Sequence, residues 1–482
     1  MALDLDGYAR IDAVALAARV RSDEVSAREV AELAVSVMER LNPQLNAVVL
    51  ADVERALAAA AQVDRSAPLA GVPFLVKDVD VFVAEWPTTF SSRYFADAAP
   101  RSDSEIVRRW RDAGLVLLGK TNTPEFAGEF VTEPALRGAT LNPWNPAVTV
   151  GGSSGGAAAA VASGMVPAAH GTDVGGSIRV PAACCGLFGL KPTRGLNPIG
   201  PHYPELGAGL DCEHVLTRTV RDSAAFLDAT SGPEPGGWYH VRRSVPSYLD
   251  ALSMTLPRLR IACVAGAPGG AKLDPEIASA LESAAALLER LGHDVVPSAF
   301  PQQLPALDEM VPLWMMDVAL EIRRRAAAIG RRPERDELEP LTWVVLERCE
   351  GLGALEYLEA RLRAHETSVT MARHVQSFDL IMTPSLAALP PAVGQIDARA
   401  EDFDYDRWSR DSYGFAPFSE IFNVTGQPAA SLPLGMSKTG LPIGIQLAAR
   451  PGEDHVLLAL SARLEAESGW TERHPPIWAG HG

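Results

Sequence analysis

Two serines in glycine-rich segments and one lysine have residue types and surroundings that suit nucleophilic catalysis. Ser153 lies in Gly151-Gly152-Ser153-Ser154-Gly155-Gly156, Ser177 follows two further glycines, and Lys77 follows a short apolar run. A serine hydroxyl becomes a useful nucleophile only beside a base, and glycines let backbone N–H groups approach a developing oxyanion closely. The three segments could therefore provide a nucleophile, a proton relay, a base and an oxyanion site without a histidine.

Lys77 comes directly after the apolar run Val72–Val76, which is broken only by Pro73. Burial at the end of a strand removes water from a lysine ammonium, lowers its pKa and allows the neutral amine to act as a base. Because charged side chains are rarely fully buried, Lys77 could instead extend to solvent or pair with the adjacent Asp78. The sequence around Lys77 leaves both interpretations open.

The Gly-x-Ser-x-Gly pattern around Ser153 also matches the nucleophile elbow of α/β-hydrolases. Such an elbow follows a strand, opens a helix and needs an acid and a histidine later in the chain. Residues 156–162 can begin a helix, but the approach over 142–147 contains two prolines and makes a poor central strand. The later histidines have no distinctive setting: His365, His374, His455 and His474.

Ser177 ends the segment Thr172-Asp173-Val174-Gly175-Gly176-Ser177, which has strong turn character. Two glycines before a hydroxyl let successive backbone N–H groups converge on one point, as the oxyanion of an acyl transfer requires. A phosphate-binding turn is the alternative interpretation. Its common spacings, G-x-x-x-x-G-K-[ST] and G-x-G-x-x-G, are both missing here, so the segment favours acyl transfer.

The composition disfavours several classes of partner. A net charge of -17 over 482 residues argues against nucleic acids and anionic membranes, which both attract excess lysine and arginine. The five cysteines form no CxxC pair, so we expect reduced, mostly buried thiols, including Cys184 and Cys185, and no metal site. Without a signal-peptide pattern or a long apolar run, we expect a soluble, cytoplasmic protein that needs no cofactor.

Helix and strand patterns alternate along the chain and indicate an α/β fold. Ser26 and Glu29 predict a capping box for a helix that Pro43 should end. The segment 400–418 has no clear period and is expected to be a loop, either on the surface or facing substrate. We expect further helices at 50–63, 104–113, 275–291, within 308–376 and at 454–467, and strands at 72–76, 115–118, 259–264, near 295, and at 378–384, 430–435 and 442–447.

Blocks of sequence spread over the whole chain match one enzyme family. The chain resembles the amidase signature enzymes from about residue 10 to about residue 470, and chance agreement over so many blocks is not credible. The resemblance implies an α/β fold in which one large domain has a central mixed β-sheet covered by helices on both faces. The matching blocks are 71–73 with 77–78, 119–122, 142–145, 151–156, 171–179, 186–193, 423–429 and 440–446.

The resemblance also implies roles for the residues singled out above. Ser177 would be the nucleophile, Ser153, in a cis peptide, would relay its proton, and Lys77 would be the general base. The nucleophile-elbow interpretation of Ser153 then falls away. The implied oxyanion hole consists of the backbone N–H groups of Val174, Gly175, Gly176 and Ser177, and the implied supporting polar residues are Ser154, Thr172, Asp173 and Arg179.

Within that single domain, the resemblance and the element patterns divide the chain into four segments. They are an N-terminal helical segment that packs on the core (1–65), the amidase signature core (66–254), a variable α/β and helical region on the substrate side (255–400), and a C-terminal loop, strands and helix that complete the core (401–482).

The blocks look closest to those of bacterial nylon-oligomer hydrolases, aryl acylamidases and urethanases. We therefore expect a serine amidase that cleaves linear C–N bonds of small amides, anilides or carbamates, with hydrolysis of the 6-aminohexanoate cyclic dimer as the alternative. The tract after Lys191–Gly195 differs from that of glutamine-hydrolysing transamidosome subunits, which disfavours a partner-dependent amidotransferase. The intact Lys77, Ser153 and Ser177 disfavour a non-catalytic binding subunit. The enzyme is expected to be a monomer or a homodimer.

The substrate pocket is expected to be largely apolar, because the amide supplies most of the polarity and water must be kept from the acyl-enzyme. Gln446, on the final strand, could reach this pocket or cap a neighbouring backbone group. The other candidates for its walls are Ala127, Gly128, Trp314, Met315 and Trp343.

Overall fold

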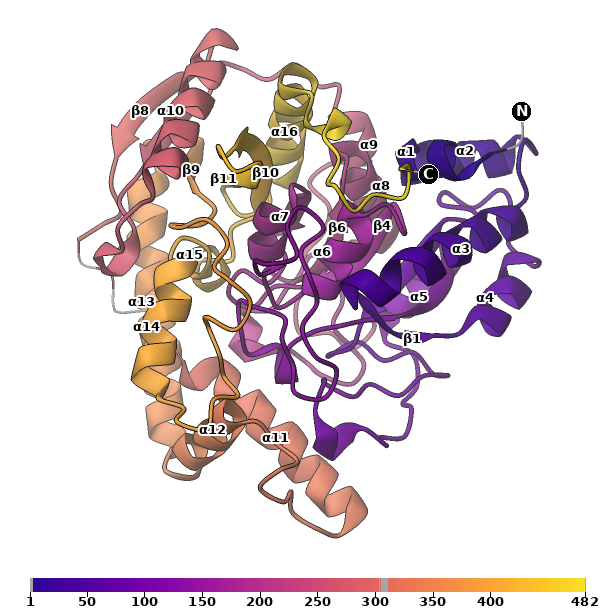
Figure 1. Cartoon of the computed structure of the whole chain (residues 1–482). Helices are drawn as coiled ribbons and strands as arrows, with labels where there is room; N and C mark the ends of the chain where they lie inside the picture. Colours follow the sequence, from indigo (N-terminus) through magenta and orange to yellow (C-terminus); the bar gives the residue numbers. More distant parts are fainter. Residues whose placement is uncertain (1–2, 303, 305–310, 482) are drawn as a thin grey trace.

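A mixed β-sheet runs through the centre of the molecule (Figure 1). The computed structural model describes residues 3–302, 304 and 311–481. Within these ranges the sheet has 11 strands. They are β1 (Val48–Ala51), β2 (Pro73–Lys77), β3 (Val116–Thr121), β4 (Ala168–Thr172), β5 (Phe188–Lys191), β6 (Glu213–Thr217), β7 (Arg260–Val264), β8 (Asp294–Ser298), β9 (Leu380–Pro384), β10 (Ala429–Met436) and β11 (Pro442–Ala449).

The strand order is β1-β3-β2-β4-β6-β5-β10-β11-β9-β7-β8, so strands from all four predicted segments share one sheet. β2 runs parallel to both β3 and β4, with Phe74 opposite Ala168 in the latter pair. The sheet continues through antiparallel pairs from β4 to β9, and β7 and β8 extend it in parallel. Every residue of β2 is buried, which explains its continuous apolar run.

Helices cover both faces of the sheet, as the family resemblance implied. α6 and α7 pack on one face, and α8, α10 and α16 pack on the other. The helices are α1 (Leu5–Arg10), α2 (Ala13–Arg21), α3 (Ala27–Leu45), α4 (Val53–Ala60), α5 (Glu105–Asp112), α6 (Gly155–Ala162), α7 (Arg179–Cys185), α8 (Val220–Thr230), α9 (Tyr248–Ala251), α10 (Pro275–Arg290), α11 (Pro312–Ile329), α12 (Pro340–Glu350), α13 (Ala354–Val375), α14 (Tyr405–Phe415), α15 (Glu420–Val424) and α16 (Asp454–Ser468).

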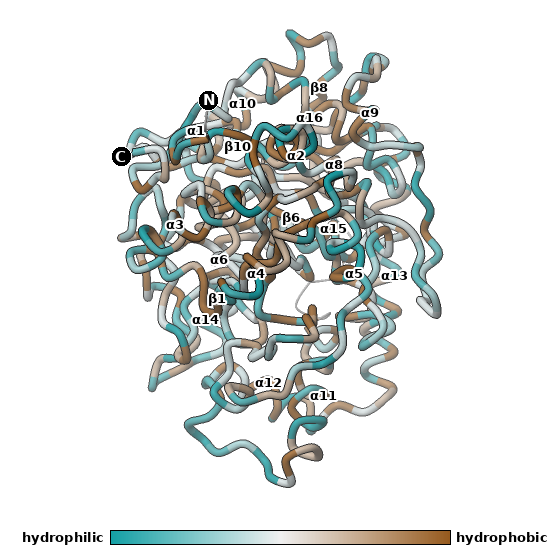
Figure 2. The backbone as a smooth tube through the Cα atoms, turned by 90° about the vertical axis from the view of Figure 1, so that its right-hand side faces the viewer, coloured by the Kyte–Doolittle hydropathy of each residue, from teal (hydrophilic) through white to brown (hydrophobic). Residues whose placement is uncertain are grey.

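Successive residues of β2 face two different hydrophobic cores. Leu75 packs in the core shared with α3, α6 and α7, whereas Phe74 and Val76 pack in the core shared with α2, α5 and α8. Hydrophobic stretches of the chain gather around β6 near the centre, and many outer loops are hydrophilic (Figure 2). Because strand side chains alternate, Lys77 projects to the same side as Leu75, toward α6.

The N-terminal helices bear out one capping prediction and correct another. Ser26 and Glu29 form the reciprocal capping box at the start of α3. Pro43 does not end this helix, which continues to Leu45 and is closed by Asn46 in the left-handed conformation. The Asn42 side chain then accepts hydrogen bonds from the N–H groups that follow the helix, so the turn after Leu45 has the donors and acceptors it needs.

The segment 400–418 is not a loop, because residues 405–415 form α14. The Asp404 side chain caps this helix by accepting the Arg407 N–H at 2.8 Å. Trp408, Ser412 and Phe415 are buried along one face of the helix. The sequence hid this helical period because one of the three buried positions is a polar serine.

The described residues contain no helix that is long and apolar enough to cross a membrane.

Candidate active site

The candidate site lies where the parallel strands β2 and β4 end, beside the first turns of α6 and α7. Lys77 is the last residue of β2 and Thr172 is the last residue of β4. α6 begins just after Ser153, and α7 begins just after Ser177. Because neighbouring parallel strands end at the same edge of a sheet, residues far apart in the chain meet here.

Lys77 has two hydroxyl neighbours in a fully buried environment. Its Nζ lies 2.6 Å from Ser153 Oγ and 2.8 Å from Thr172 Oγ1. Burial lowers the pKa of Lys77 to about 8, although the carboxylates of Asp80 and Asp211 oppose this shift. A lysine with such a pKa is partly neutral near physiological pH and can accept a proton from the serine.

Neither alternative position of Lys77 occurs. The side chain is 0% exposed and therefore does not extend to solvent. The adjacent Asp78 carboxylate instead accepts a hydrogen bond from Lys120 Nζ at 3.1 Å and another from the Thr89 N–H at 3.0 Å. The side chain of Lys77 is thus directed to the two hydroxyls.

Ser153 follows a cis peptide bond from Gly152, as the resemblance implied. A Cβ at Gly152 would lie 2.5 Å from the Val131 carbonyl oxygen, so only glycine fits there. No strand leads into this serine: the approach 142–150 holds only isolated bridges among the described residues. The nucleophile-elbow interpretation therefore fails on local structure as well.

Ser177 presents an unpaired hydroxyl and a row of unpaired backbone donors. The residue is 7% exposed. Within the part of the chain that the structure describes, no hydrogen bond engages its Oγ or the backbone N–H groups of Val174, Gly175, Gly176 and Ser177. Gly176 has φ 142°, and a Cβ there would lie 2.3 Å from Ser419 Oγ. Unpaired N–H groups beside a hydroxyl can stabilise an oxyanion formed by its attack.

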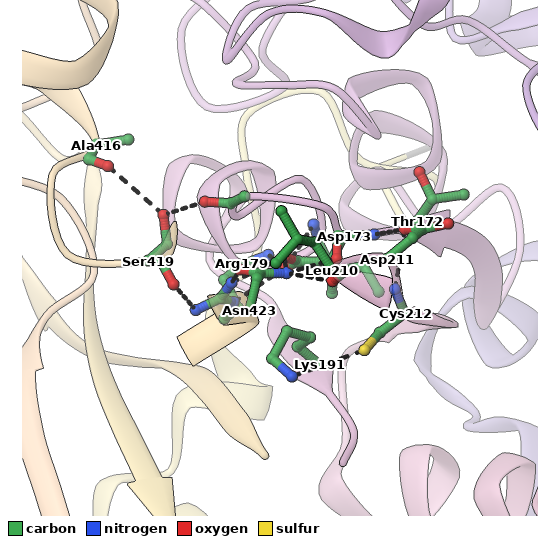
Figure 3. A network of polar contacts seen from close by, with 12 residues as sticks. Thr172, Asp173, Arg179, Lys191, Leu210, Asp211, Cys212, Ala416, Ser419 and Asn423 are labelled. Carbon is green, nitrogen blue, oxygen red and sulfur yellow. Dashed lines mark hydrogen bonds and ion pairs between the residues drawn. The ribbon is translucent and has the colours of Figure 1, made fainter. Parts of the chain in front are cut away.

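A buried polar network holds the Ser177 segment in place (Figure 3). Arg179 donates to Asp173 through Nη2 at 2.8 Å and through Nε at 3.0 Å. Although burial alone would raise it, the Arg179 charge holds the pKa of Asp173 below its usual value. Asn423 on α15 donates to the Asp173 carbonyl at 2.6 Å, and the Ile178 N–H donates to the Asp173 carboxylate at 3.1 Å. These bonds link the segment to a helix from the C-terminal part of the chain.

A second pair of contacts joins the two serine segments to each other. The Ser154 N–H donates to the Ser177 carbonyl at 3.2 Å, and Ser154 Oγ donates to the Thr172 carbonyl at 3.4 Å. The residues that the resemblance placed beside the oxyanion hole, namely Ser154, Thr172, Asp173 and Arg179, therefore all surround the Ser177 segment.

A cavity lies over Ser177 and encloses about 940 Å³, part of it open to solvent. Ser153 and Thr172 also line it, so both serines face the same space. As expected for an apolar pocket, many of the walls are aromatic: Phe90, Phe126, Phe130, Trp314, Trp408 and Tyr413.

Half of the predicted pocket residues line this cavity. Ala127, Gly128 and Trp314 do so. The prediction was wrong for Met315, which is 1% exposed in the main core, because consecutive residues of α11 point in different directions. It was also wrong for Trp343, which does not line the cavity. The Nε1 of this side chain donates instead to the Arg335 carbonyl at 3.0 Å.

Gln446 does not line the cavity either. It accepts a hydrogen bond from Arg179 Nη1 at 2.8 Å and donates to the Phe418 carbonyl at 3.0 Å. Of the two positions foreseen for this side chain, it therefore takes the one that satisfies neighbouring polar groups.

A sequence model of the amidase family matches residues 29–458. The chain belongs to the amidase family. This amidase is 38% identical over 479 residues to the 6-aminohexanoate-cyclic-dimer hydrolase of Paenarthrobacter ureafaciens, covering 97% of this chain and 96% of the relative. It is 37% identical over 474 residues to a putative amidase, AmiC, of Mycobacterium bovis, covering 98% of this chain and 97% of that one.

Solved structures show the same architecture. A 6-aminohexanoate cyclic dimer hydrolase complexed with substrate matches with a TM-score of 0.93 and 36% identity, covering 97% of this chain and 99% of that chain. A bacterial aryl acylamidase of the amidase signature enzymes matches with a TM-score of 0.87 and 27% identity, covering 98% of this chain and 99% of that chain. The similarity confirms the expected family and α/β fold, and the protein is a serine amidase with hydrolase activity.

The amidase site contains a buried dyad that sequence reasoning missed. The backbone N–H of Lys77 donates to His170 Nδ1 at 3.3 Å. The other ring nitrogen of His170, Nε2, then donates to Glu213 Oε2 at 2.5 Å. Burial lowers the pKa of His170 well below its usual value and raises the pKa of Glu213 to about 8. The available signal was a histidine inside the apolar strand β4, one residue before the glycine that leads to Thr172.

Proposed function

We propose that this amidase hydrolyses small-molecule amides through a serine acyl-enzyme, with Ser177 as nucleophile, Ser153 as proton relay and Lys77 as base. One observation carries the proposal. A fully buried lysine amine lies 2.6 Å from Ser153 Oγ, at the wall of the cavity that Ser177 also lines. This is the arrangement in which a hydroxyl can be activated without a histidine.

In the first half of the proposed reaction, neutral Lys77 takes the proton of Ser153, which takes the proton of Ser177 as its Oγ attacks the amide carbon. The carbonyl oxygen becomes an oxyanion, and the unpaired N–H groups at 174–177 stabilise it. The C–N bond then breaks. Lys77 returns its proton through Ser153 to the leaving nitrogen, so an amine departs and an ester to Ser177 remains.

In the second half, a water molecule attacks the ester and gives its proton to Lys77 through the same relay. The same N–H groups stabilise the second oxyanion, and the carboxylic acid leaves as Ser177 recovers its hydroxyl proton. The aromatic walls limit the number of water molecules around the acyl group, which favours an ordered attack over side reactions.

We propose amides of ω-amino acids, with the 6-aminohexanoate cyclic dimer as the first candidate, as the substrate class. Two observations support this choice: the identity to a 6-aminohexanoate-cyclic-dimer hydrolase over 97% of the chain, and a cavity whose aromatic walls suit methylene chains. The expectation from sequence ranked linear amides, anilides and carbamates first. Linear aryl amides remain the second candidate because a bacterial aryl acylamidase shares the fold.

The proposal is tested by measuring turnover of four substrates with the same preparation: the cyclic dimer, an anilide, an aliphatic amide and a carbamate. We expect the highest kcat/KM for the cyclic dimer. Ser177→Ala should lower kcat on every substrate by at least about a thousandfold, because the acyl-enzyme cannot form. Ser283→Ala, an exposed position on α10, is the matched control and should retain activity. Undiminished turnover by Ser177→Ala would overturn the mechanism.

A further inference from the structure

The cavity over Ser177 has an unusual charge distribution. No lysine or arginine is among its lining residues, whereas five carboxylic side chains are: Asp80, Glu129, Asp317, Glu321 and Glu420. Carboxyl groups beside aromatic rings form the usual surroundings for a bound organic cation. The charge of this cavity is therefore matched to a positively charged ligand group rather than to an anionic one.

One of these carboxylates is already neutralised by the protein. Glu321 on α11 accepts from Arg101 Nη2 at 2.7 Å and from Arg324 Nη1 at 2.9 Å. Its charge is thus compensated from outside the cavity. Two other acids of the cavity, Asp317 and Asp80, have no such ion pair among the described residues, although the charges of Arg324 and Lys77 partly oppose the rise in their respective pKa values.

Asp317 lies one turn before Glu321 on the same helix and faces the same cavity. Its carboxylate accepts the Gly207 N–H at 2.5 Å to Oδ2, and among the described residues it has no other hydrogen bond and no ion pair. Burial raises its pKa to about 6, although the Arg324 charge opposes this shift.

Asp80 also lines the cavity and lies on the loop after β2, with φ 57°. No hydrogen bond or ion pair to its carboxylate is found in the described ranges of the chain. Burial raises its pKa well above the usual value, and the charges of Asp211, Glu213 and Asp317 act in the same direction. The Lys77 charge opposes this shift only in part, so Asp80 and Asp317 are two mutually repelling carboxyl groups in the walls of one cavity, neither held in an ion pair among the described residues.

The cavity itself is built for a ligand, independently of its acids. Ser177 is 7% exposed, its hydroxyl has no hydrogen-bond partner among the described residues, and it lines the same cavity as Asp80 and Asp317. A buried nucleophile with free hydrogen-bonding capacity needs a bound molecule to act on. The acids thus lie in the walls of a substrate site.

We propose that Asp80 and Asp317 bind an ammonium group carried by the acyl part of the substrate, so that the amidase is selective for ω-aminoacyl amides. This inference rests on the proposed function and adds the charge of the substrate to it. Opening a cyclic amide breaks the C–N bond, and the released amine stays attached to the acyl group. Once protonated, it is held by the two carboxylates and cannot attack the ester to close the ring again.

A metal ion is a poorer match for these acids than an ammonium group. No three His, Cys, Asp or Glu side chains converge closely enough to hold a metal, as far as the described residues extend. An alkylammonium needs only one or two carboxylates, and its methylene chain can lie against the aromatic walls.

The test compares two anilides that differ in one charge: 6-aminohexanoyl p-nitroanilide and its isostere heptanoyl p-nitroanilide. We expect the wild-type enzyme to have a kcat/KM on the order of tenfold higher for the aminoacyl compound, because a buried ion pair is made only there. Asp80→Asn and Asp317→Asn should each lower this ratio toward one. Asparagine tolerates the positive φ of residue 80 and can still accept the Gly207 N–H at residue 317.

Asp411→Asn is the matched control. Asp411 is exposed on α14, so this substitution removes the same charge from a position outside the cavity. It should keep the wild-type ratio. A wild-type ratio of one or less would overturn the inference. An unchanged ratio in both cavity variants would also overturn it. If Asp80→Asn shifted the pH profile for both anilides without changing the ratio, Asp80 would act on Lys77 rather than on the substrate.

A measurement without variants guards against loss of folding. Hexylamine should inhibit hydrolysis of the neutral anilide competitively, with an inhibition constant on the order of tenfold below that of hexanol. Equal inhibition by the two compounds would contradict ammonium binding even while the proposed hydrolysis stands. If neither anilide nor the cyclic dimer is hydrolysed, the proposed function fails, and calorimetric binding of hexylamine over hexanol still decides the charge preference.

Discussion

At the scale of single residues, the proposed base must lose its proton before it can act. Burial lowers the pKa of Lys77 to about 8, while Asp80, Asp211, Glu213 and Asp173 partly oppose this shift. The charged form is inactive as a base, so the neutral fraction grows as the pH rises through the pKa. The pH range of activity is therefore determined by the desolvation of one side chain.

We predict that kcat/KM for a neutral anilide rises about tenfold per pH unit below the pKa of Lys77 and levels off above about pH 8. Lys77→Ala should remove this rise and retain least activity near neutrality, with partial recovery at high pH, where hydroxide replaces the base. Lys438→Ala, at an exposed lysine, should keep the wild-type profile. A rise that still levels off near pH 8 in Lys77→Ala would assign the titration to another group.

The residues for which we propose catalytic roles could be located from sequence, but their electrostatic surroundings could not. Glycine-rich segments and an apolar run drew attention to Lys77, Ser153 and Ser177, and the family resemblance then implied their roles. His170 and Asp80 show no such pattern, because their importance comes from strands and helices that meet only in the folded chain. Two pocket candidates, Met315 and Trp343, failed because apolar residues of α11 and α12 are equally suited to the core and to a cavity wall.

At the scale of elements, α15 and the loop before α7 depend on one another. Asn423 donates to the Asp173 carbonyl at 2.6 Å, to its carboxylate at 2.9 Å and to the Leu210 carbonyl at 3.1 Å. It also accepts from Arg179 Nη2 at 2.5 Å. The side chain is 1% exposed, so each of these partners would lose one buried hydrogen bond without it.

We predict that Asn423→Ala lowers the free energy of unfolding by about 1–3 kcal/mol and lowers kcat more than it changes KM. The reason is that Asp173 and Arg179 hold the backbone whose N–H groups face the oxyanion, and misplaced donors affect the transition state most. Asn145→Ala, at an exposed position in the loop over 142–147, serves as control. Denaturant unfolding and steady-state kinetics on one anilide measure both quantities, and an unchanged kcat would rule out this positioning role.

At the scale of the whole molecule, the order of strands in the sheet differs from their order in the chain. β1 lies at one edge and β8 at the other, while β10 and β11 insert between β5 and β9. Seven of the strands were predicted because their apolar patterns are local, whereas no strand was predicted at β1, β4, β5 or β6, and α14 was missed where a buried serine broke the helical period. The pairing of β5 with β10 joins residues 188–191 to 429–431, which no local pattern indicates.

The N-terminal helices are joined to this sheet assembly through one buried carboxylate. Asp222 on α8 accepts the N–H groups of Ala13 at 2.9 Å and Val14 at 3.0 Å, the first two residues of α2. Those groups have no partner within their own helix, because the first turn of any helix lacks acceptors. Asp222 therefore both caps α2 and attaches it to the helix layer.

We predict that Asp222→Ala lowers the free energy of unfolding by about 2–5 kcal/mol, since two N–H donors lose their acceptor in a buried location. Asp222→Asn should lose less, because its amide oxygen can still accept from one of them. Asp112→Ala, at a carboxylate that is 65% exposed on α5, should unfold at the wild-type denaturant concentration. If Asp222→Ala unfolded there too, this carboxylate would contribute nothing measurable to the stability of the molecule.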